Sequence, residues 1–230
     1  MRFFVPAVFL TACRVLTAAA APAAGIGDTT DVALGDGITC PGAPTSCDDA
    51  LTLRLGHNGI NVGDSKTLYH DVTEALEALC AEDYCLSKAA TFPVSIIEST
   101  SRGPYYRERV DKTISVTILT ADWGRRVDVR KFMSNTIAAA FERGTYDPKN
   151  CYMNRVKGDK VEHFRDCMTL DYAEVVLSNG YSMKVMFGGP RSSVKGLNYD
   201  CKREVDDMYP FLKNDLAWKA KAVYVYCLSK

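Results

Sequence analysis

The sequence predicts an α+β fold in which helices cover one face of an antiparallel-rich sheet and disulfides staple the elements together. The first observation is Asn179-Gly180, which separates two alternating apolar runs and is a strong hairpin signal. The second is that segments with strand and helix periodicity alternate from Ala50 onwards. The third is that eight cysteines follow an apolar leader, as in secreted disulfide-bonded proteins. We expect a single domain over residues 49–230.

Residues 1–20 are predicted to be a secretory signal peptide. Arg2 precedes a short apolar run, and Ala18-x-Ala20 forms a cleavage pattern. This run is too short to span a bilayer, and no later stretch is apolar enough to be a transmembrane segment. The alternative is a lipid-anchored bacterial envelope protein, because Leu10-Thr-Ala-Cys13 looks like a lipobox. We therefore expect a secreted, extracellular protein.

The charge balance argues against general nucleic-acid binding. The chain has 28 basic and 28 acidic residues. Removing residues 1–20 takes away Arg2 and Arg14 and no acid, so 26 basic and 28 acidic residues remain. A general nucleic-acid binder needs a surplus of basic charge against the phosphates.

The cysteines predict disulfides rather than a metal site. Cys13 leaves with the signal, and an even number behind a secretion signal indicates bridges formed in an oxidising compartment. The spacings lack the paired CxxC or Cys/His patterns of zinc sites, so neither a metal nor a cofactor is expected. The connectivity stays open, and we favour Cys151 with Cys167 and Cys201 with Cys227. The disulfide-forming set is Cys40, Cys47, Cys80, Cys85, Cys151, Cys167, Cys201 and Cys227.

The sequence of the first half of the domain predicts a strand, a helix and two further strands. Residues 21–48 lack periodicity and are expected to form an extended entry segment or a propeptide. Leu51, Leu53 and Leu55 alternate as a strand, and Gly63-Asp64-Ser65 is expected to open a helix. The apolar stripe of that helix is Leu68, Val72, Leu76 and Leu79. The next strands are expected at Phe92–Ser99 and Lys112–Ala121.

The second half predicts two helices around a hairpin. A helix from Asp128 to Arg143 is expected to end at Gly144 as a C-terminal cap, and a long loop then carries Cys151 and Cys167. A helical region follows at about Cys201–Lys219, where Pro210 is expected to kink it or start a second helix. Ala222–Leu228 is the closing strand.

The hairpin register is predicted residue by residue. A three-residue loop, Ser178-Asn179-Gly180, with Gly180 in a left-handed conformation keeps the apolar residues on one face. It pairs Leu177 with Tyr181, Val175 with Met183 and Ala173 with Val185. On the other face it places Glu174 opposite Lys184, an attractive cross-strand pair.

Taken together, the elements read as three βαβ units. Six successive elements give βαββαβ, the ferredoxin-like or split βαβ pattern, with the helices on one face of the sheet. A signal peptide, eight mature cysteines and a βαββαβ core from Lys112 to Leu228 resemble the secreted cysteine-rich effector proteins of plant-associated fungi. In particular they resemble those with the ferredoxin-like fold of viral killer toxins from fungi. The resemblance is one of architecture over residues 50–230.

That resemblance implies a non-enzymatic protein that binds a target of a host or a competing microbe, either a protein or another cell-surface target. Killer toxins are matured by dibasic cleavage, and this chain has Arg125-Arg126 and Lys202-Arg203. Both pairs fall at predicted helix starts within the domain, so we expect them to stay uncut.

The segment Ser101 to Asp111 is the best candidate contact surface. It combines residue types enriched at binding hot spots, and it should stand at an edge of the sheet. A solvated turn made by Gly103-Pro104 is the simpler interpretation, which we favour. The candidate binding residues are Arg102, Tyr105, Tyr106, Arg107 and Arg109.

The chief alternative is a secreted hydrolase, specifically a ribonuclease. Glu162, His163 and Arg165 offer a base, an acid and an anion binder, although neighbouring strand residues point to opposite faces. Gly63-Asp64-Ser65 resembles an esterase nucleophile block but lacks the late Asp-x-x-His that would activate the serine, so helix capping explains it better. The segment Gly188 to Gly196 lacks P-loop spacing and is expected to be a mobile connection.

Overall fold

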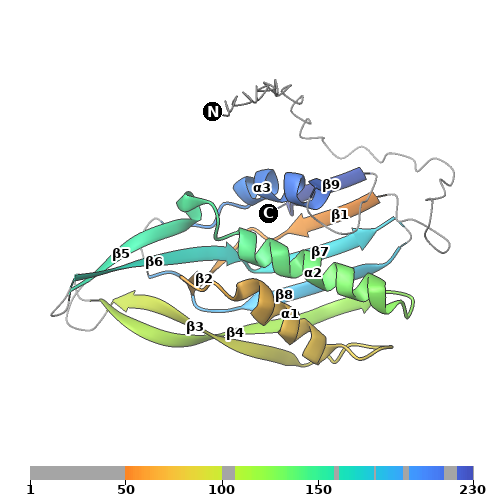
Figure 1. Ribbon diagram of the computed structural model, residues 1–230, viewed down its shortest axis with the longest axis horizontal. Coiled ribbons are helices and arrows are strands. Elements are labelled where there is room, and N and C mark those ends of the chain that lie inside the picture. Colours follow the sequence, from red (N-terminus) through yellow and green to blue (C-terminus); the bar gives the residue numbers. More distant parts are fainter. Residues whose placement is uncertain are drawn as a thin grey trace, which may run out of the picture. The chain divides into compact units, whose positions relative to one another are not determined.

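The structure, a computed structural model, describes residues 50–99, 107–157, 161–178, 180–193, 197–214 and 222–229 (Figure 1). These residues belong to one compact unit, Ile38–Lys230. The signal peptide 1–20, the entry segment 21–48, Cys40 and Cys47 lie outside the described residues, as do Arg102, Tyr105 and Tyr106 of the candidate contact surface.

The described residues form a mixed α+β structure, as predicted. The strands of the larger sheet are β1 (Ala50–Leu55), β3 (Ala89–Ser99), β4 (Arg107–Asp122), β7 (Tyr172–Leu177), β8 (Ser182–Gly188) and β9 (Ala222–Cys227). The smaller sheet contains β2 (Gly59–Gly63), β5 (Cys151–Lys157) and β6 (Val161–Leu170). The helices are α1 (Leu68–Leu79), α2 (Val127–Arg143) and α3 (Cys201–Asn214), with a 3₁₀ turn at Pro148–Asn150.

The larger sheet has the strand order β3-β4-β8-β7-β1-β9. Its neighbouring strands are antiparallel except β1 and β9, which are parallel. In Figure 1, α1 and α2 lie across this sheet and α3 lies beside β9. β4 and β7 are parallel with β8 between them, and the chain connects them through α2 and then through the β5–β6 hairpin of the smaller sheet. The complete ferredoxin-like order is not confirmed, since the closing strand β9 pairs with β1 and β3 takes the place beside β4.

The predicted loop carrying Cys151 and Cys167 is wrong, because these residues lie in paired strands. β5 and β6 form an antiparallel hairpin in which Cys151 faces Cys167 and Tyr152 faces Asp166. β2 completes this sheet by pairing with β6. The apolar residues of β5 and β6 do not alternate regularly with polar ones, so their sequence carries little of the pattern that signals a strand.

The hairpin between β7 and β8 has the predicted register. Glu174 pairs with Lys184, and Val175 pairs with Met183. The Leu177 backbone N–H donates to the Tyr181 carbonyl at 2.8 Å. Gly180 has φ +92°, the left-handed region that the three-residue loop requires. The observed register is therefore the one that the local turn chemistry predicts.

Two helix boundaries differ from the prediction. α1 begins at Leu68 after Thr67, and not at Asp64 or Ser65, because pairing with β6 keeps the chain extended as far as Gly63. Gly144 follows α2 with right-handed φ −51°, so it is not a left-handed cap. An added Cβ there would lie 2.5 Å from Thr169 Oγ1, so the glycine permits close packing.

Of the two outcomes expected at Pro210, a kink or the start of a second helix, the second is wrong. Pro210 lies inside α3, which continues to Asn214, so the proline does not start a second helix. Pro210 is exposed, and its ring therefore meets solvent rather than the core. The dibasic pair Lys202-Arg203 lies in the first turn of α3, and Arg125-Arg126 directly precedes α2.

Three disulfides are present among the described residues. Cys151–Cys167 and Cys201–Cys227 confirm the two favoured pairings, and Cys80–Cys85 closes a short loop after α1. Cys201–Cys227 joins α3 to β9, and Cys151–Cys167 crosslinks the β5–β6 hairpin. Within the described ranges, none of the helices has the length and apolar character needed to span a membrane.

One core joins the helices to the inner face of the larger sheet. Alternate residues of β1, β4, β7 and β8 point inward and are almost fully buried, which leaves the other face of those strands for a different use. Phe141 on α2 is fully buried and its ring centroid lies 4.3 Å from that of Phe187 on β8. The two faces of the sheet are therefore chemically distinct.

Candidate functional site

The face of the larger sheet that points away from the core carries a row of polar side chains. Strand pairing places Arg54 beside both Tyr226 and Glu174, and Glu174 beside Lys184. The row thus crosses four strands in the order β9, β1, β7, β8. We call this surface the outer sheet face; its residues are Arg54, Tyr172, Glu174, Lys184, Met186, Tyr224 and Tyr226.

Glu174 is the centre of the row. Its side chain is 5% exposed, while those of Arg54 and Lys184 are 37% and 39% exposed. The carboxylate accepts hydrogen bonds from Arg54 Nη1 and from the Tyr172 hydroxyl, both at 3.2 Å, and Lys184 Nζ lies 3.3 Å away. A nearly buried carboxylate is therefore matched by two cations and one hydroxyl, as burial of a charge requires.

The tyrosines of this face are held in defined positions. Arg54 Nε donates to the Tyr226 hydroxyl at 2.5 Å, and the Arg54 guanidinium lies 5.7 Å from the centre of the Tyr226 ring. Burial, followed by the charge of Glu174, raises the pKa of Tyr172 to about 12. Tyr172 therefore stays protonated at neutral pH and continues to donate to Glu174.

Exposed apolar surface borders the polar row. Tyr224 is 51% exposed and lies two residues before Tyr226 on the same face of β9. Met186 is 47% exposed and pairs with Tyr172 across β7 and β8. Tyr, Met and Arg are the residue types enriched at protein interfaces, and arginine and tyrosine are common hot spots.

The Glu174–Lys184 pair should contribute measurably to folding. In a double-mutant cycle with Glu174→Gln and Lys184→Met, we expect a coupling free energy of about 1 kcal/mol, discounted for the exposure of Lys184. Urea unfolding of the four proteins gives this value. The control cycle is Lys112 with Glu98, 3.0 Å apart and both 35% exposed, for which about 0.5 kcal/mol or less is expected. Equal coupling in the two cycles would show that burial of Glu174 adds nothing.

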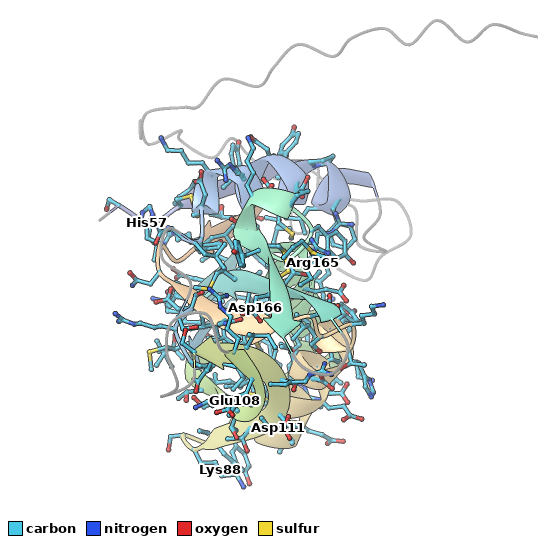
Figure 2. All side chains as sticks on the ribbon, turned by 90° about the vertical axis from the view of Figure 1, so that its left-hand side faces the viewer. His57, Lys88, Glu108, Asp111, Arg165 and Asp166 are labelled. Atoms are coloured by element: carbon cyan, nitrogen blue, oxygen red, sulfur yellow. A yellow bond between two sulfur atoms is a disulfide. The ribbon has the colours of Figure 1, made fainter. Side chains whose placement is uncertain are left out.

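The predicted contact surface is only partly described. Arg107 and Arg109 lie in β4 rather than in a loop. The Arg107 guanidinium lies 5.6 Å from the ring centre of Tyr152 on β5, a partner that the sequence did not suggest. Figure 2 views the side of the molecule where Glu108 and Asp111 of β4 lie below Arg165 and Asp166 of β6.

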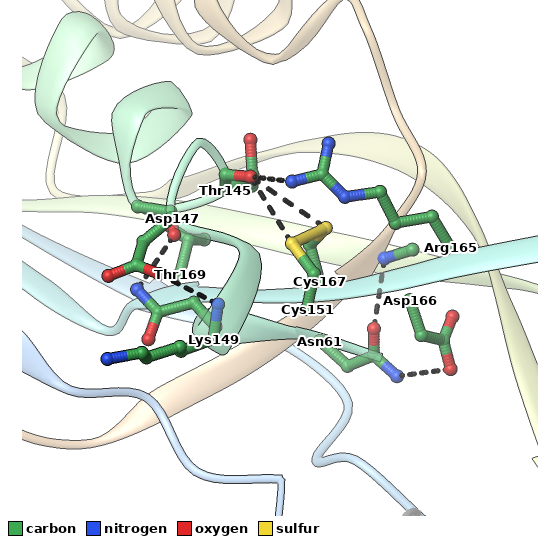
Figure 3. Close-up of a disulfide and its surroundings, with 12 residues drawn as sticks. Asn61, Thr145, Asp147, Lys149, Cys151, Arg165, Asp166, Cys167 and Thr169 are labelled. Atoms are coloured by element: carbon green, nitrogen blue, oxygen red, sulfur yellow. Dashed lines mark hydrogen bonds between the residues drawn. A yellow bond between two sulfur atoms is a disulfide. The ribbon is translucent and has the colours of Figure 1, made fainter. Parts of the chain in front are cut away.

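The predicted ribonuclease residues lie in β6. Positions 163 and 165 fall on one face of the strand and position 162 on the other, so strand geometry divides the set. The side chains of Glu162 and His163 lie outside the described residues. Arg165 Nη2 donates to the Thr145 carbonyl at 2.7 Å, beside the Cys151–Cys167 disulfide (Figure 3).

Asp166 is a buried carboxylate that was not among the predicted site residues. It is 1% exposed, and it accepts from the Ile97 backbone N–H at 3.3 Å and from Asn61 Nδ2 at 3.4 Å. Figure 3 shows the bond between Asp166 and Asn61. These contacts join β6 to β3 and β2, so Asp166 holds the two sheets together.

The Gly63-Asp64-Ser65 segment lines a pocket of about 200 Å³ with Arg165. Ser65 Oγ accepts the Thr67 backbone N–H at 3.4 Å, so the serine belongs to the turn before α1. None of the residues lining this pocket is a histidine, and the serine therefore has no imidazole base there. In the part of the chain that is described, no group of three or more His, Cys, Asp or Glu side chains is placed to hold a metal ion.

Comparisons with known proteins return no match. No protein-family description, curated protein or solved structure is similar to this chain at a significant level. The geometry of the outer sheet face and of the pocket is therefore the basis for proposing a function.

Proposed function

We propose that this is a secreted, disulfide-stabilised effector or toxin-like protein that acts by binding a protein of a host or a competing microbe. The observation that carries the proposal is the outer sheet face, where Glu174 fixes Arg54, and Arg54 in turn fixes Tyr226. Side chains already ordered in the free protein lose less conformational entropy on binding. Exposed tyrosines and a methionine beside them supply apolar contact area.

Several disulfides are consistent with an extracellular protein. β4 and β7 are parallel with β8 between them, as in a split βαβ unit, although the β5–β6 hairpin is inserted after α2. On this architecture alone we propose kinship to the ferredoxin-like effectors and killer toxins. It implies recognition rather than catalysis.

A biological assay with face variants tests this proposal. The mature protein, secreted by an oxidising host, is infiltrated into leaf tissue and added to fungal and bacterial cultures, and the dose giving a tissue response or growth arrest is measured. We expect the variant Tyr224→Ala with Arg54→Gln to need at least about tenfold more protein, because two hot-spot side chains are lost. Circular dichroism confirms that each variant is folded.

The matched control is Tyr84→Ala. Tyr84 is 60% exposed and lies in the Cys80–Cys85 loop, away from β9 and β1, so its variant should keep the potency of the parent protein. Equal potency of all three proteins would remove the outer sheet face from the proposal. If the parent protein caused no response in any of these systems, the effector proposal itself would be overturned.

A secreted ribonuclease is the second candidate. Arg165 lines a pocket together with Ser65, Thr145 and Tyr146, so a cation and several hydroxyl groups surround one cavity. Cleavage of RNA by the purified protein, lost on His163→Ala, would favour this candidate over the effector. We expect no such cleavage.

A further inference from the structure

The pocket beside Arg165 contains two half-buried charges of opposite sign. Its lining comes from the turn before α1, from the end of α2 and the residues after it, and from β6. The lining residues are Gly63, Asp64, Ser65, Lys66, Glu142, Thr145, Tyr146, Arg165 and Cys167. Its volume is about 200 Å³, enough to hold several water molecules.

Arg165 lacks an acidic partner among the described residues. It donates one hydrogen bond, to the Thr145 carbonyl, whereas a guanidinium has five N–H donors. The other arginines that are fixed by acids, such as Arg54 and Arg126, each have a carboxylate within 3.2 Å. Arg165 therefore offers the pocket a positive charge and unused donors.

Glu142 likewise lacks a basic partner within the described ranges. Its carboxylate accepts one hydrogen bond, from the Tyr146 hydroxyl at 3.0 Å. Burial and this bond raise the pKa of Tyr146, so the tyrosine remains a donor at neutral pH. Glu142 and Arg165 line the same pocket but form no ion pair with each other in the part of the chain that the structure describes. Neither charge therefore has an ionic partner among the described residues that line the pocket.

The rest of the pocket lining also contains both positive and negative charge. The turn containing Lys66 precedes the N-terminus of α1, where the helix dipole is positive, and Glu142 lies at the C-terminus of α2, where it is negative. Lys66 and Arg165 balance Asp64 and Glu142, so the pocket has no formal net charge. A ligand with only one kind of charge would meet repulsion as well as attraction.

We propose that this pocket binds a small zwitterion carrying both a carboxylate and an ammonium group, as a free α-amino acid does. The carboxylate contacts Arg165, which is suited to planar oxyanions. The ammonium group contacts Glu142. The ligand bridges the two charges and completes the hydrogen bonding that each of them lacks.

Titration with glycine and with its two halves tests the proposal. Glycine, acetate and methylammonium are added at pH 7 to the full-length mature protein, and amide NMR shifts around the pocket give each dissociation constant. We expect glycine to bind at least about tenfold more tightly than either half, because one molecule makes both ionic contacts. Absence of glycine binding, or binding no tighter than that of acetate, would overturn the proposal.

Two variants test which protein charge contacts which group of the ligand. Arg165→Gln should weaken glycine and acetate binding about tenfold and leave methylammonium unchanged or tighter. Glu142→Gln should weaken glycine and methylammonium while acetate binds a few-fold more tightly, since a like charge is removed. If Arg165→Gln fails to fold, Arg165→Lys serves in its place, with a smaller weakening expected because the planar fork is lost.

The control variant is Asp83→Asn. Asp83 is 67% exposed in the Cys80–Cys85 loop and does not line the pocket, so all three dissociation constants should be unchanged. If Asp83→Asn changed the three dissociation constants as much as Arg165→Gln and Glu142→Gln do, the pocket would not be the binding site. Opposite responses of acetate to Arg165→Gln and Glu142→Gln are the signature that a purely structural role of Arg165 would not produce.

Discussion

Gly63→Ala is expected to destabilise the protein by roughly 2 to 5 kcal/mol. Gly63 has φ +65°, a conformation that costs alanine about 1 to 2 kcal/mol. In addition, an alanine Cβ would lie 2.0 Å from the Ser95 carbonyl oxygen. That oxygen belongs to the backbone of β3, so relief requires the two strands to move apart. Urea unfolding of the variant gives the loss in free energy of unfolding.

Gly180→Ala is the matched control. Gly180 also has a left-handed φ, +92°, but an added Cβ would meet no atom within 4 Å. This variant should therefore lose about 1 to 2 kcal/mol, the conformational cost alone. Equal losses at Gly63 and Gly180 would show that the close approach of β2 to β3 is not needed for stability.

The effect at Gly63 should also extend to the junction of the two sheets. Gly63 ends β2 and its backbone N–H donates to Asn61 Oδ1 at 2.9 Å, while Asn61 Nδ2 donates to the buried Asp166. A shift of Gly63 therefore disturbs the contacts that hold β6 against β3. Because Gly63 also lines the pocket of Arg165, ligand binding there should weaken in the Gly63→Ala protein.

Stability is expected to fall as the pH rises from about 4.5 to 8 because of Glu204. This residue is 1% exposed, and burial is the main reason that its pKa is raised from 4.5 to about 8. The charge of Asp207 adds to the shift, and the hydrogen bond from Tyr199 opposes it. At neutral pH the folded protein therefore keeps Glu204 protonated.

The sign follows from proton binding. Below about pH 4.5 both folded and unfolded chains hold the proton, and between pH 4.5 and 8 only the folded chain holds it. Each pH unit in this window should therefore remove about 1.4 kcal/mol, which amounts to a loss on the order of 5 kcal/mol by pH 8. Above pH 8 both chains release the proton, and this contribution stays constant.

Glu204→Gln should remove this dependence. The amide is uncharged at every pH and can still accept from the Tyr199 hydroxyl, which lies 2.5 Å from Glu204 Oε2. Urea unfolding at pH 5, 6.5 and 8 compares the variant with the parent protein and with Glu77→Gln, whose acid is exposed on α1. A Glu204→Gln protein whose stability fell with pH as steeply as that of the parent would refute the assignment.

The elements that could be predicted are those whose signal is local. The β7–β8 hairpin follows from Asn179-Gly180 and the alternation around it, and α2 follows from its apolar spacing. The sequence favours two pairings, Cys151–Cys167 across an expected long loop and Cys201–Cys227 between the expected last helix and the closing strand, and both bridges are present. Secretion and the effector function stay predictions.

The candidate site could not be predicted, because it depends on which strands become neighbours. Tyr226 and Arg54 are far apart in sequence, and the parallel pairing of β9 with β1 brings them together. In the same way, Glu142 and Arg165 line one pocket because the end of α2 and the residues after it pack against β6, where Arg165 donates to the Thr145 carbonyl and Thr169 donates to the Phe141 carbonyl. Neither contact can be inferred from the residues that are adjacent to these side chains in the sequence.

The sequence by itself determined the α+β class, the main helices, the hairpin register and the cysteines available for bridging. These depend on residues within a few positions of one another, where turn geometry and periodicity act directly. The tertiary structure alone decided the strand order, the second sheet, the outer sheet face and the pocket. Those features depend on the free energy gained when whole elements bury their apolar surfaces against each other. No short segment of the sequence determines which elements become neighbours in this way.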